Sequence, residues 1–249
     1  MTVPLSACII VKNEADRIAK CIEAVSRVVD EIVVVDSGSN DDTCEIAKSL
    51  GARLFFRAWD GYGPQKRFAE DCASYDWILN LDADEVLTPE LAAEISKLMT
   101  SAPPLKAYRF RQVTVYPNAK QPRLWADAHN YVRLYDRRAV RFRESLVHDT
   151  VDLAGHEAGQ LRNSAWHYSW RTLDHVRRKL DLYTDLQARE LKKSRAEVLL
   201  RLPFEYPILF ARYYLLRRHF TGGLYGVKAA HTFATGRTMR LVKFLRPKP

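Results

Sequence analysis

Acidic residues follow two apolar runs of the sequence, and their spacing is that of a metal-binding motif. Asp82 and Asp84 come directly after the run 77–81, and Asp36 comes directly after the run 31–35. Carboxylates at positions i and i+2 that leave a strand can point into one crevice, and Mg²⁺ and Mn²⁺ prefer carboxylate oxygen beside substrate phosphates. The pattern therefore predicts a metal site that holds a diphosphate. Solvated turns and helix caps carry the same residue types, so the prediction depends on the elements that position them.

Short apolar runs alternate with helical patterns over the first hundred residues. The runs are continuously apolar, which is typical of parallel strands covered on both faces, and ligands of such sheets bind beyond the carboxyl ends of the strands. We therefore expect an α/β fold with a mainly parallel sheet flanked by helices. The expected strands are 5–11, 31–35, 52–56 and 77–81, and the expected helices are 14–28, 39–50, 64–74 and 89–100.

The second half of the chain has two further patterns. Residues 105–143 have a mixed, strand-rich pattern with many arginines and tyrosines. We interpret them as the half of the domain that binds the acceptor substrate. From 171 onward the pattern is helical, with expected helices to about 195, to about 220 and, after Gly222-Gly223, to about 245. The second half thus ends in a helical extension.

Charge is distributed unevenly along the chain. Residues 1–161 contain 20 Lys and Arg against 24 Asp and Glu, a net charge of −4, whereas residues 162–249 contain 19 against 6, a net charge of +13. Amphipathic basic helices of this kind lie at anionic membrane surfaces. Packing on the catalytic domain with the basic faces in water is the alternative. Nucleic acid is not an expected partner, because no recognised fold or motif accompanies the charge.

The chain lacks the signals of a secreted or membrane-spanning protein. Lys12, Asn13 and Glu14 interrupt the first apolar run, so it does not match a secretory signal, and no window has the roughly 18 to 20 apolar residues of a spanning helix. The four cysteines show no metal-type spacing and are expected to be reduced thiols. We expect a cytoplasmic protein that associates peripherally with the inner membrane.

Three motifs occur in order: CIIVKNE (8–14), VVDSGS (34–39) with Asp41 and Thr43, and LDADE (81–85). Together they resemble the inverting glycosyltransferases of family 2, which have the GT-A fold. The later segments RLY (133–135), VHD (147–149) and HYSW (167–170) resemble the branch that contains lipopolysaccharide inner-core β-1,4-glucosyltransferases. The resemblance implies a GT-A catalytic domain over 1–165, with a nucleotide-sugar half (1–100) and an acceptor half (101–165), and a helical, basic, membrane-associating extension over 166–249.

The resemblance also implies roles for individual residues. Asp84 would bind the metal, Mg²⁺ or Mn²⁺, and Asp82 would face the ribose of a UDP-sugar. A cation opposite a diphosphate is physically apt, which suits Lys66 and Arg67. For these two residues the alternative is an ordinary solvated helix face. For Asp36 the alternative is the cap of a turn. The donor-binding set is Val11, Glu14, Asp36, Lys66, Arg67, Asp82 and Arg133.

An inverting transfer needs a base on the acceptor hydroxyl, and the resemblance points to the second half of the domain. Asp149 is the candidate, with Glu144 in reserve, because the branch tends to have glutamate where this chain has Asp149. His148 could orient the base or the donor phosphates. We expect His167 to pack between tryptophans, with a metal or phosphate role left open.

The predicted function is transfer of a hexose, most simply glucose, from a UDP-sugar to a lipopolysaccharide core or other lipid-linked glycan. Two alternatives stay open. A nucleotidyltransferase would need a glycine-rich, lysine-bearing first loop, which Lys12-Asn13-Glu14 does not supply. A non-catalytic protein of the membrane surface would use the acidic turns only as caps.

Overall fold

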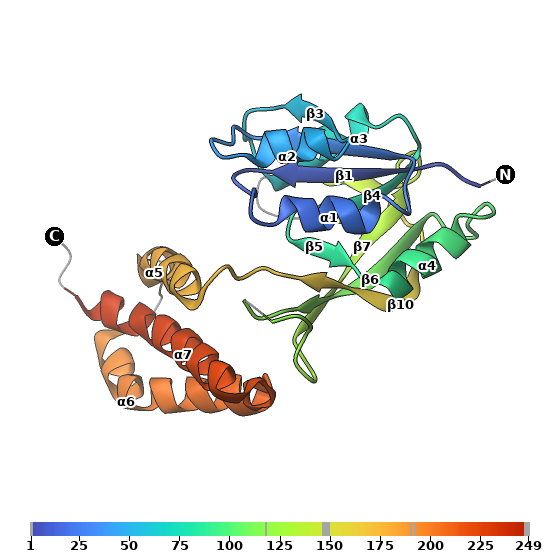
Figure 1. Cartoon of the computed structure of the whole chain (residues 1–249). Coiled ribbons are helices and arrows are strands. Elements are labelled where there is room, and N and C mark those ends of the chain that lie inside the picture. Colours follow the sequence, from blue (N-terminus) through green and yellow to red (C-terminus); the bar gives the residue numbers. More distant parts are fainter. Residues whose placement is uncertain (1, 118, 146–149, 190, 192, 247–249) are drawn as a thin grey trace. The chain divides into compact units, whose positions relative to one another are not determined.

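The computed structural model describes residues 2–117, 119–145, 150–189, 191 and 193–246, and the chain forms two compact units (Figure 1). The first unit comprises 1–113 and 128–167, and the second comprises 114–127 and 168–249. The boundary after His167 lies two residues beyond the one expected at 165. The segment 114–127, which we had placed in the acceptor half, clusters with the C-terminal helices instead.

The first unit is built on an eight-stranded sheet with the order β3-β2-β1-β4-β7-β6-β10-β5. Its first four strands are parallel and lie where the apolar runs predicted them, so the expected α/β fold class is confirmed. β1 lies between β2 and β4, at the centre of this parallel part. The four strands are β1 (Leu5–Val11), β2 (Glu31–Asp36), β3 (Arg53–Phe56) and β4 (Trp77–Asp82).

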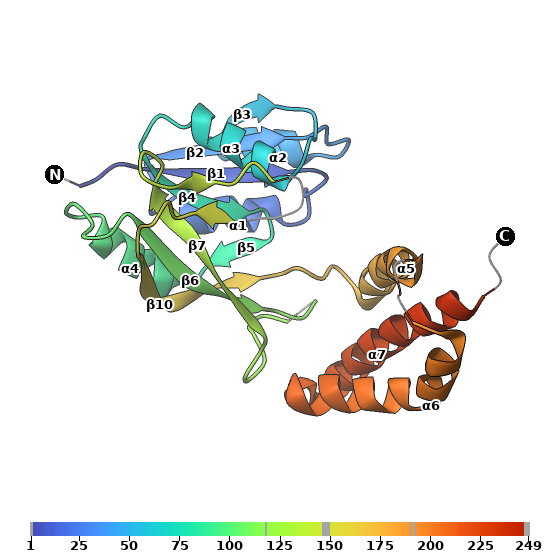
Figure 2. The same cartoon turned by 180° about the vertical axis from the view of Figure 1, so that it is seen from behind.

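Helices cover both faces of the parallel strands, because successive side chains of a strand point to opposite faces. Ala7 and Ile9 of β1 belong to the core under α1 (Ile18–Val25), α2 (Thr43–Ser49) and α4 (Pro89–Leu98). Cys8 belongs to the core under α3 (Tyr62–Cys72). Figure 1 views the sheet from the side of α1, and Figure 2 shows the opposite side.

The register of the strands brings the acidic motifs to one edge. Val11, the last residue of β1, lies opposite Asp36 on β2, and Ile10 lies opposite Asp82 on β4. All three strands are parallel, so the loops that follow them leave from the same, carboxyl edge. The fold thus places both acidic turns where ligands of such sheets bind.

The remaining strands of the sheet form antiparallel pairs. β7 (Ala128–Asp136) pairs antiparallel with both β4 and β6 (Ala107–Thr114), and β10 (Ala158–His167) pairs antiparallel with β5 (Glu85–Leu87). The last residue of β10, His167, lies opposite Glu85. A small second sheet consists of β8 (Arg141–Phe142) and β9 (Val151–Asp152). β5 was not predicted, because three residues are too few to show a period.

The second unit contains the expected helices α5 (Leu173–Arg189), α6 (Arg195–Ala211) and α7 (Gly223–Leu245). A π-helical turn (Arg212–Leu216) and a 3₁₀ turn (His219–Gly222) join α6 to α7, and α7 packs against both α5 and α6. Gly226 allows this turn to approach α7, since a Cβ there would lie 1.8 Å from the carbonyl oxygen of His219. Among the described helices, none is both long and apolar enough to cross a bilayer.

Segment 114–127 is held in the second unit by aromatic and polar contacts. The Tyr116 ring stacks on Trp170 and His219, and its hydroxyl is hydrogen-bonded to Nδ1 of that histidine. Arg123 donates hydrogen bonds to the carbonyl oxygens of Arg217 and Arg218 at 2.8 and 2.9 Å. Arg217, Arg218 and His219 are more than ninety residues away in sequence from the residues they contact, so periodicity could not predict the association.

We expect the buried carboxylate of Glu70 to be essential for the stability of the first unit. It accepts hydrogen bonds from the hydroxyl of Tyr135, the backbone N–H of Phe142 and Nε of Arg141, at 2.8, 3.1 and 2.7 Å. Glu70→Ala should lower the free energy of unfolding by about 3 to 5 kcal/mol, because it leaves buried partners unpaired. The measurement is urea denaturation followed by circular dichroism.

Asp71→Ala is the matched control, because exposed Asp71 contacts the same Arg141 at 2.5 Å. Its effect should stay below about 1 kcal/mol, as for other exposed ion pairs. Equal effects of the two substitutions would show that burial of Glu70 is unimportant.

Candidate active site

The turn after β2 is organised by Asp36. Its buried carboxylate accepts hydrogen bonds from the backbone N–H groups of Gly38 and Ser39 and from the hydroxyl of Ser39, at 2.8 to 3.1 Å for the backbone donors. Gly38 has a φ of +93°, a conformation that glycine adopts without strain. Asp36 therefore caps its own turn, and three donors occupy most of the four lone-pair sites of its carboxylate.

The loop after β1 is attached to the loop after β2. The backbone N–H of Asn13 donates to the hydroxyl of Ser39 at 2.9 Å, and that of Glu14 donates to the hydroxyl of Thr43 at 2.8 Å. The side chain of Asn13 accepts from the N–H of Asn40. Val11, just before this loop, is buried in the apolar core, so its side chain supports the edge of the site from within.

Charged side chains from four elements meet around Asp82 at the end of β4. Nζ of Lys66 on α3 lies 2.8 Å from Oδ1 of Asp82, and Nη2 of Arg133 on β7 lies 3.0 Å from Oδ2. The same Nη2 lies 3.1 Å from the carboxylate of Glu85 on β5. Lys66, Arg133 and Glu85 are all buried. Buried charges are tolerated only when they are paired, so these residues stabilise one another as a set.

The cluster shifts the pKa values of its two acids in opposite directions. Burial alone would raise the pKa of Asp82, but the Lys66 ammonium and the Arg133 guanidinium outweigh burial and hold that pKa well below its usual range. Burial raises the pKa of Glu85, against the opposing effect of Arg133, and the negative charge of Asp82 raises it further. Asp82 is therefore the more acidic member of the cluster.

Asp84, in the turn between β4 and β5, lies between two cationic or potentially cationic groups. Its Oδ2 is 3.2 Å from Nη1 of Arg17, and its Oδ1 is 3.5 Å from Nε2 of His167 at the end of β10. Arg17 also forms an ion pair with Glu14. Burial would lower the pKa of His167, but the carboxylates of Asp84, Glu85 and Asp82, of which Asp84 has the largest effect, together outweigh burial and raise it.

Asp84 and His167 together can hold a divalent cation. In the part of the chain that the structure describes, no three His, Cys, Asp or Glu side chains converge on one point. Mg²⁺ in phosphate-transferring sites needs only one or two protein ligands, because phosphate oxygens and water complete its coordination. The pair fits such an ion, and the imidazole nitrogen favours a transition metal such as Mn²⁺ over Mg²⁺.

Lys66 and Arg67 are neighbours in sequence but have different surroundings. Lys66 joins the Asp82 cluster, whereas Arg67 donates a hydrogen bond to the carbonyl oxygen of Phe142 at 2.9 Å and lies 3.7 Å from the carboxylate of Glu144. Consecutive residues of a helix point about 100° apart, which explains the difference. Glu144 is exposed, and the structure does not bring it to the Asp82 cluster.

Segment 143–145, which contains Glu144, is held against the first turn of α3. The N–H of Gly63 donates to the carbonyl oxygen of Ser145 at 3.0 Å, and a Cβ at Gly63 would lie 2.0 Å from the carbonyl oxygen of Arg143. Only glycine permits this approach. His148 and Asp149, the other two catalytic candidates, lie outside the described residues.

Arg17 and Glu85 are site residues that the sequence analysis did not assign. Glu85 directly follows the acidic pair, and its proximity to Arg133 depends on an antiparallel pairing that no local pattern predicts. Arg17 precedes α1 and resembles any exposed helix-terminal arginine in sequence. For His167 the sequence analysis favoured packing beside tryptophans and left a metal or phosphate role open, and the structure places its Nε2 3.5 Å from Asp84.

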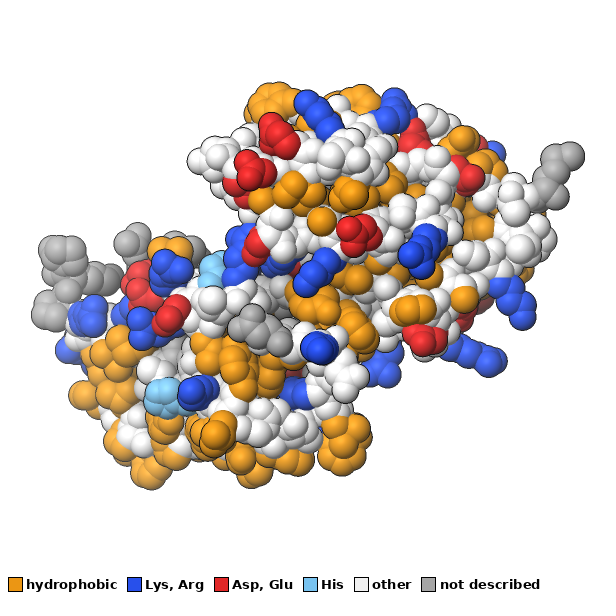
Figure 3. Space-filling view, viewed as in Figure 1, with side chains coloured by type: hydrophobic (Ala, Val, Ile, Leu, Met, Phe, Trp, Pro, Cys, Tyr) orange, Lys and Arg blue, Asp and Glu red, His pale blue; other side chains and the backbone are white. Residues whose placement is uncertain are grey.

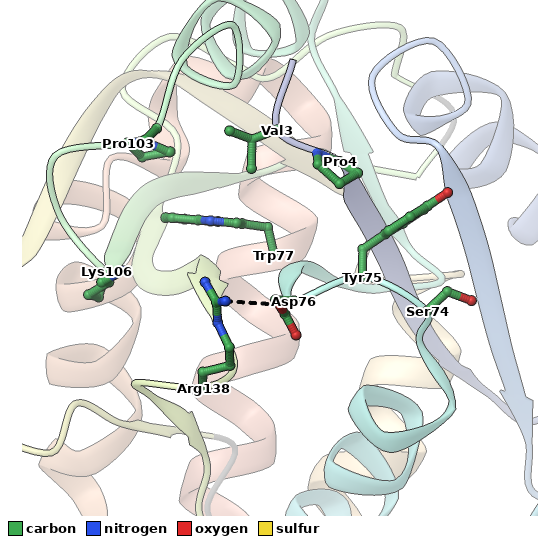
Figure 4. Close-up of a pocket in the computed structure, with 10 residues that line it drawn as sticks. Val3, Pro4, Ser74, Tyr75, Asp76, Trp77, Pro103, Lys106 and Arg138 are labelled. Carbon is green, nitrogen blue, oxygen red and sulfur yellow. Dashed lines mark ion pairs between the residues drawn. The ribbon is translucent and has the colours of Figure 1, made fainter. Parts of the chain in front are cut away.

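A cavity of about 370 Å³ lies at the opposite edge of the sheet (Figure 4). Val3 and Pro4 precede β1 there, and Trp77 begins β4. Two of its charged groups pair with each other: Arg138 lies 3.2 Å from Asp76. Because ligands of parallel sheets bind at the carboxyl edge, this cavity is not the active-site candidate.

The mixed α/β sheet with an acidic pair at its carboxyl edge has the architecture of the GT-A fold class. Comparison with known proteins agrees with this class, since the model of glycosyl transferase family 2 matches residues 6–168. The chain belongs to this family.

Two relatives match nearly the whole chain. It is 38% identical to an uncharacterized glycosyltransferase of Rickettsia felis, over 96% of this chain and 88% of that protein. It is 30% identical to the lipopolysaccharide core biosynthesis glycosyltransferase LpsC of Rhizobium meliloti, over 93% of this chain and 88% of that protein.

A solved structure matches a smaller part. Glucosyl-3-phosphoglycerate synthase from Mycobacterium tuberculosis, in complex with Mn²⁺, UDP and glucosyl-3-phosphoglycerate, aligns with a TM-score of 0.37 and 22% identity. The alignment covers 47% of this chain and 45% of that one, which is less than half of each.

We expect the Asp84 carboxylate to control the protonation of His167. In Asp84→Asn the pKa of His167 should fall, because the variant lacks the carboxylate that does most to offset burial of the imidazolium, and only the smaller effects of Glu85 and Asp82 remain. The measurement is NMR titration of the histidine rings, with His167→Gln to assign the signal. Asp16→Asn is the control, since Asp16 lies 3.9 Å from Nε of Arg17, is exposed and does not contribute to the shift of the His167 pKa. An unchanged pKa in Asp84→Asn would contradict the observed geometry.

Proposed function

We propose that this glycosyltransferase moves a hexose, specifically glucose, from a UDP-sugar to a lipopolysaccharide core or other lipid-linked glycan, with inversion at the anomeric carbon. The convergence of Asp84 and His167 at the carboxyl edge carries the proposal. Similarity to a protein named for lipopolysaccharide core biosynthesis supports the acceptor class. The proposals of a UDP donor and of inversion rest on the resemblance of the motifs at 8–14, 34–39 and 81–85 to those of the inverting glycosyltransferases of family 2.

The two acidic turns and their partners form the proposed donor site. Asp36 would bond the uracil or ribose, with Val11 and Glu14 bordering the base, and Asp82 would face the ribose. Lys66 and Arg133 already pair with Asp82, so their contribution to the diphosphate would be a positive local potential close to it. A donor contact by Arg67 stays a prediction, because its present contacts are with residues 142 and 144.

Asp84 and His167 are the residues that would hold Mg²⁺ or Mn²⁺. A bound divalent cation would neutralise the charge that grows on the departing diphosphate. Arg17 now pairs with Asp84, so it would have to share that carboxylate or give it up. His167 must lose its proton to act as a ligand, and its pKa is raised, so metal binding should weaken on acidification.

The protein chain itself must supply the base that removes the proton from the acceptor hydroxyl. Asp149 is our proposal, with His148 to orient it or the donor phosphates, and exposed Glu144 is the alternative. We also propose that the reaction takes place on the cytoplasmic side of the inner membrane. Cys8, Cys21, Cys44 and Cys72 are free thiols, which is consistent with a reducing compartment.

Titration calorimetry of UDP with and without Mn²⁺ tests the donor site. Wild type should bind UDP more tightly with Mn²⁺, and Asp84→Ala should lose the metal-dependent gain, with a loss of affinity of at least about 10- to 100-fold. Asp16→Ala, next to the site, should behave as wild type. Undiminished metal-dependent binding in Asp84→Ala would contradict the metal site, and no UDP binding by wild type would overturn the uridine donor.

The base is tested separately from donor binding. Asp149→Asn should bind UDP normally but release it from UDP-glucose about 10²- to 10⁴-fold more slowly in the presence of a truncated lipopolysaccharide acceptor, the range expected for loss of a general base. Glu144→Gln is the comparison. Loss of turnover in Glu144→Gln with normal turnover in Asp149→Asn would transfer the role to Glu144.

A further inference from the structure

Large apolar side chains on one face of the second unit are exposed to water. Leu200, Leu216 and Leu224 expose 77, 76 and 84% of their surfaces. Figure 3 shows such side chains gathered over the region of α6 and the turns that follow it. We call this set the outer apolar face: Leu200, Phe204 and Ile208 of α6, Leu216 of the π turn, Phe220 of the 3₁₀ turn and Leu224 of α7.

Packing within the unit does not explain these residues. α6 uses a different side to contact α7, where Val198 and Glu205 are buried. Leu200, Phe204 and Ile208 follow one another at intervals of four, which places them along one exposed side of the helix. A helix at the surface of a water-soluble unit is normally polar on its outer side, and a contiguous apolar patch marks an interaction surface.

The segment 114–127 adds two exposed apolar residues beside the 3₁₀ turn. Leu124 and Trp125 are exposed, and the hydroxyl of Thr221 in that turn donates to the carbonyl oxygen of Leu124 at 2.7 Å. The guanidinium of Arg218 lies 5.5 Å from the centre of the Trp125 ring. Tryptophan beside arginine is frequent where an apolar phase meets water, because one end of each side chain is apolar and the other polar.

The charge of the chain after Glu205 indicates the chemistry of the partner. No Asp or Glu follows Glu205 in the sequence, whereas nine Lys and Arg do. Glu205 is itself buried and paired with Arg201 and Arg240. The partner must therefore combine apolar depth with negative charge. A second copy of this unit would instead bring the same positive charge to the contact.

We propose that the outer apolar face docks on an anionic lipid bilayer. α6 lies in the interface, with Leu200, Phe204 and Ile208 at the level of the acyl chains and the surrounding basic side chains at the phosphates. Arg201 and Arg212 within α6 and the π turn are compatible with a helix that lies in the interface. This docking goes beyond the proposed transfer reaction and does not depend on its donor or acceptor.

Flotation of the full chain with lipid vesicles tests the proposal. Wild type should bind vesicles that contain phosphatidylglycerol and bind phosphatidylcholine vesicles much more weakly. The triple variant Leu200→Ser, Phe204→Ser, Ile208→Ser should lose at least about 100-fold in partitioning, since each apolar side chain contributes about tenfold. Arg212 of the π turn and Lys228, four residues after Leu224 on α7, are both exposed, and Arg212→Gln with Lys228→Gln should lose about fivefold for each charge at low salt.

Leu182→Ser is the matched control, because Leu182 on α5 is 70% exposed but lies outside the face. Its vesicle binding should equal that of wild type. Asp84→Ala should also bind vesicles normally, so a failure of the donor proposal and a failure of the docking proposal give different results. Vesicle binding that survives the triple substitution would overturn the docking surface.

A second measurement does not depend on the triple variant folding. Phe204→Trp should show fluorescence quenching by brominated acyl chains in anionic vesicles, and Leu182→Trp should show no quenching beyond that of wild type. Light scattering without lipid completes the test. A dimer that dissociates in Phe204→Ser, together with no vesicle binding, would show that the face is a contact between copies of the chain.

Discussion

The carboxyl edge of the sheet depends on the buried charges around Asp82. Lys66 comes from α3, Arg133 from β7 and Glu85 from β5, so the ion pairs of one carboxylate connect the parallel and antiparallel parts of the sheet and the helix that covers it. Each member needs the others, because a buried charge without a partner is strongly destabilising. The turn that carries Asp84 begins and ends within this set, which limits where Asp84 can lie.

The parallel part of the fold could be predicted from the sequence because its signals are local. Runs such as residues 32–35 are apolar throughout and are separated by helical patterns, and the order of the motifs then indicates which loops meet at one edge. The helix boundaries were predicted less well: the first helix begins at Ile18, because the residues after Glu14 form a turn. Local propensity does not determine the ends of helices.

The site was predictable in its residue types and less so in its contacts. The acidic pair and Lys66 were found by position, but the 2.8 Å contact between Lys66 and Asp82 is a property of the packed helix and sheet. The role of Asp36 as the cap of its own turn was one of two interpretations, and the structure shows that the cap is present without excluding a ligand. His167 reaches Asp84 only because β10 pairs with β5, eighty residues earlier.

Because 114–127 packs with the C-terminal helices, the second unit is discontinuous in sequence. The chain enters it at 114, leaves at 127 and returns at 168, so the unit is assembled from two separate stretches. A truncation after His167 would therefore not remove a module cleanly. It would leave Tyr116 without Trp170 and His219, and Arg123 without the carbonyl groups that it binds. The helices therefore cannot be exchanged between relatives by themselves. A chimera must replace segment 114–127 together with them.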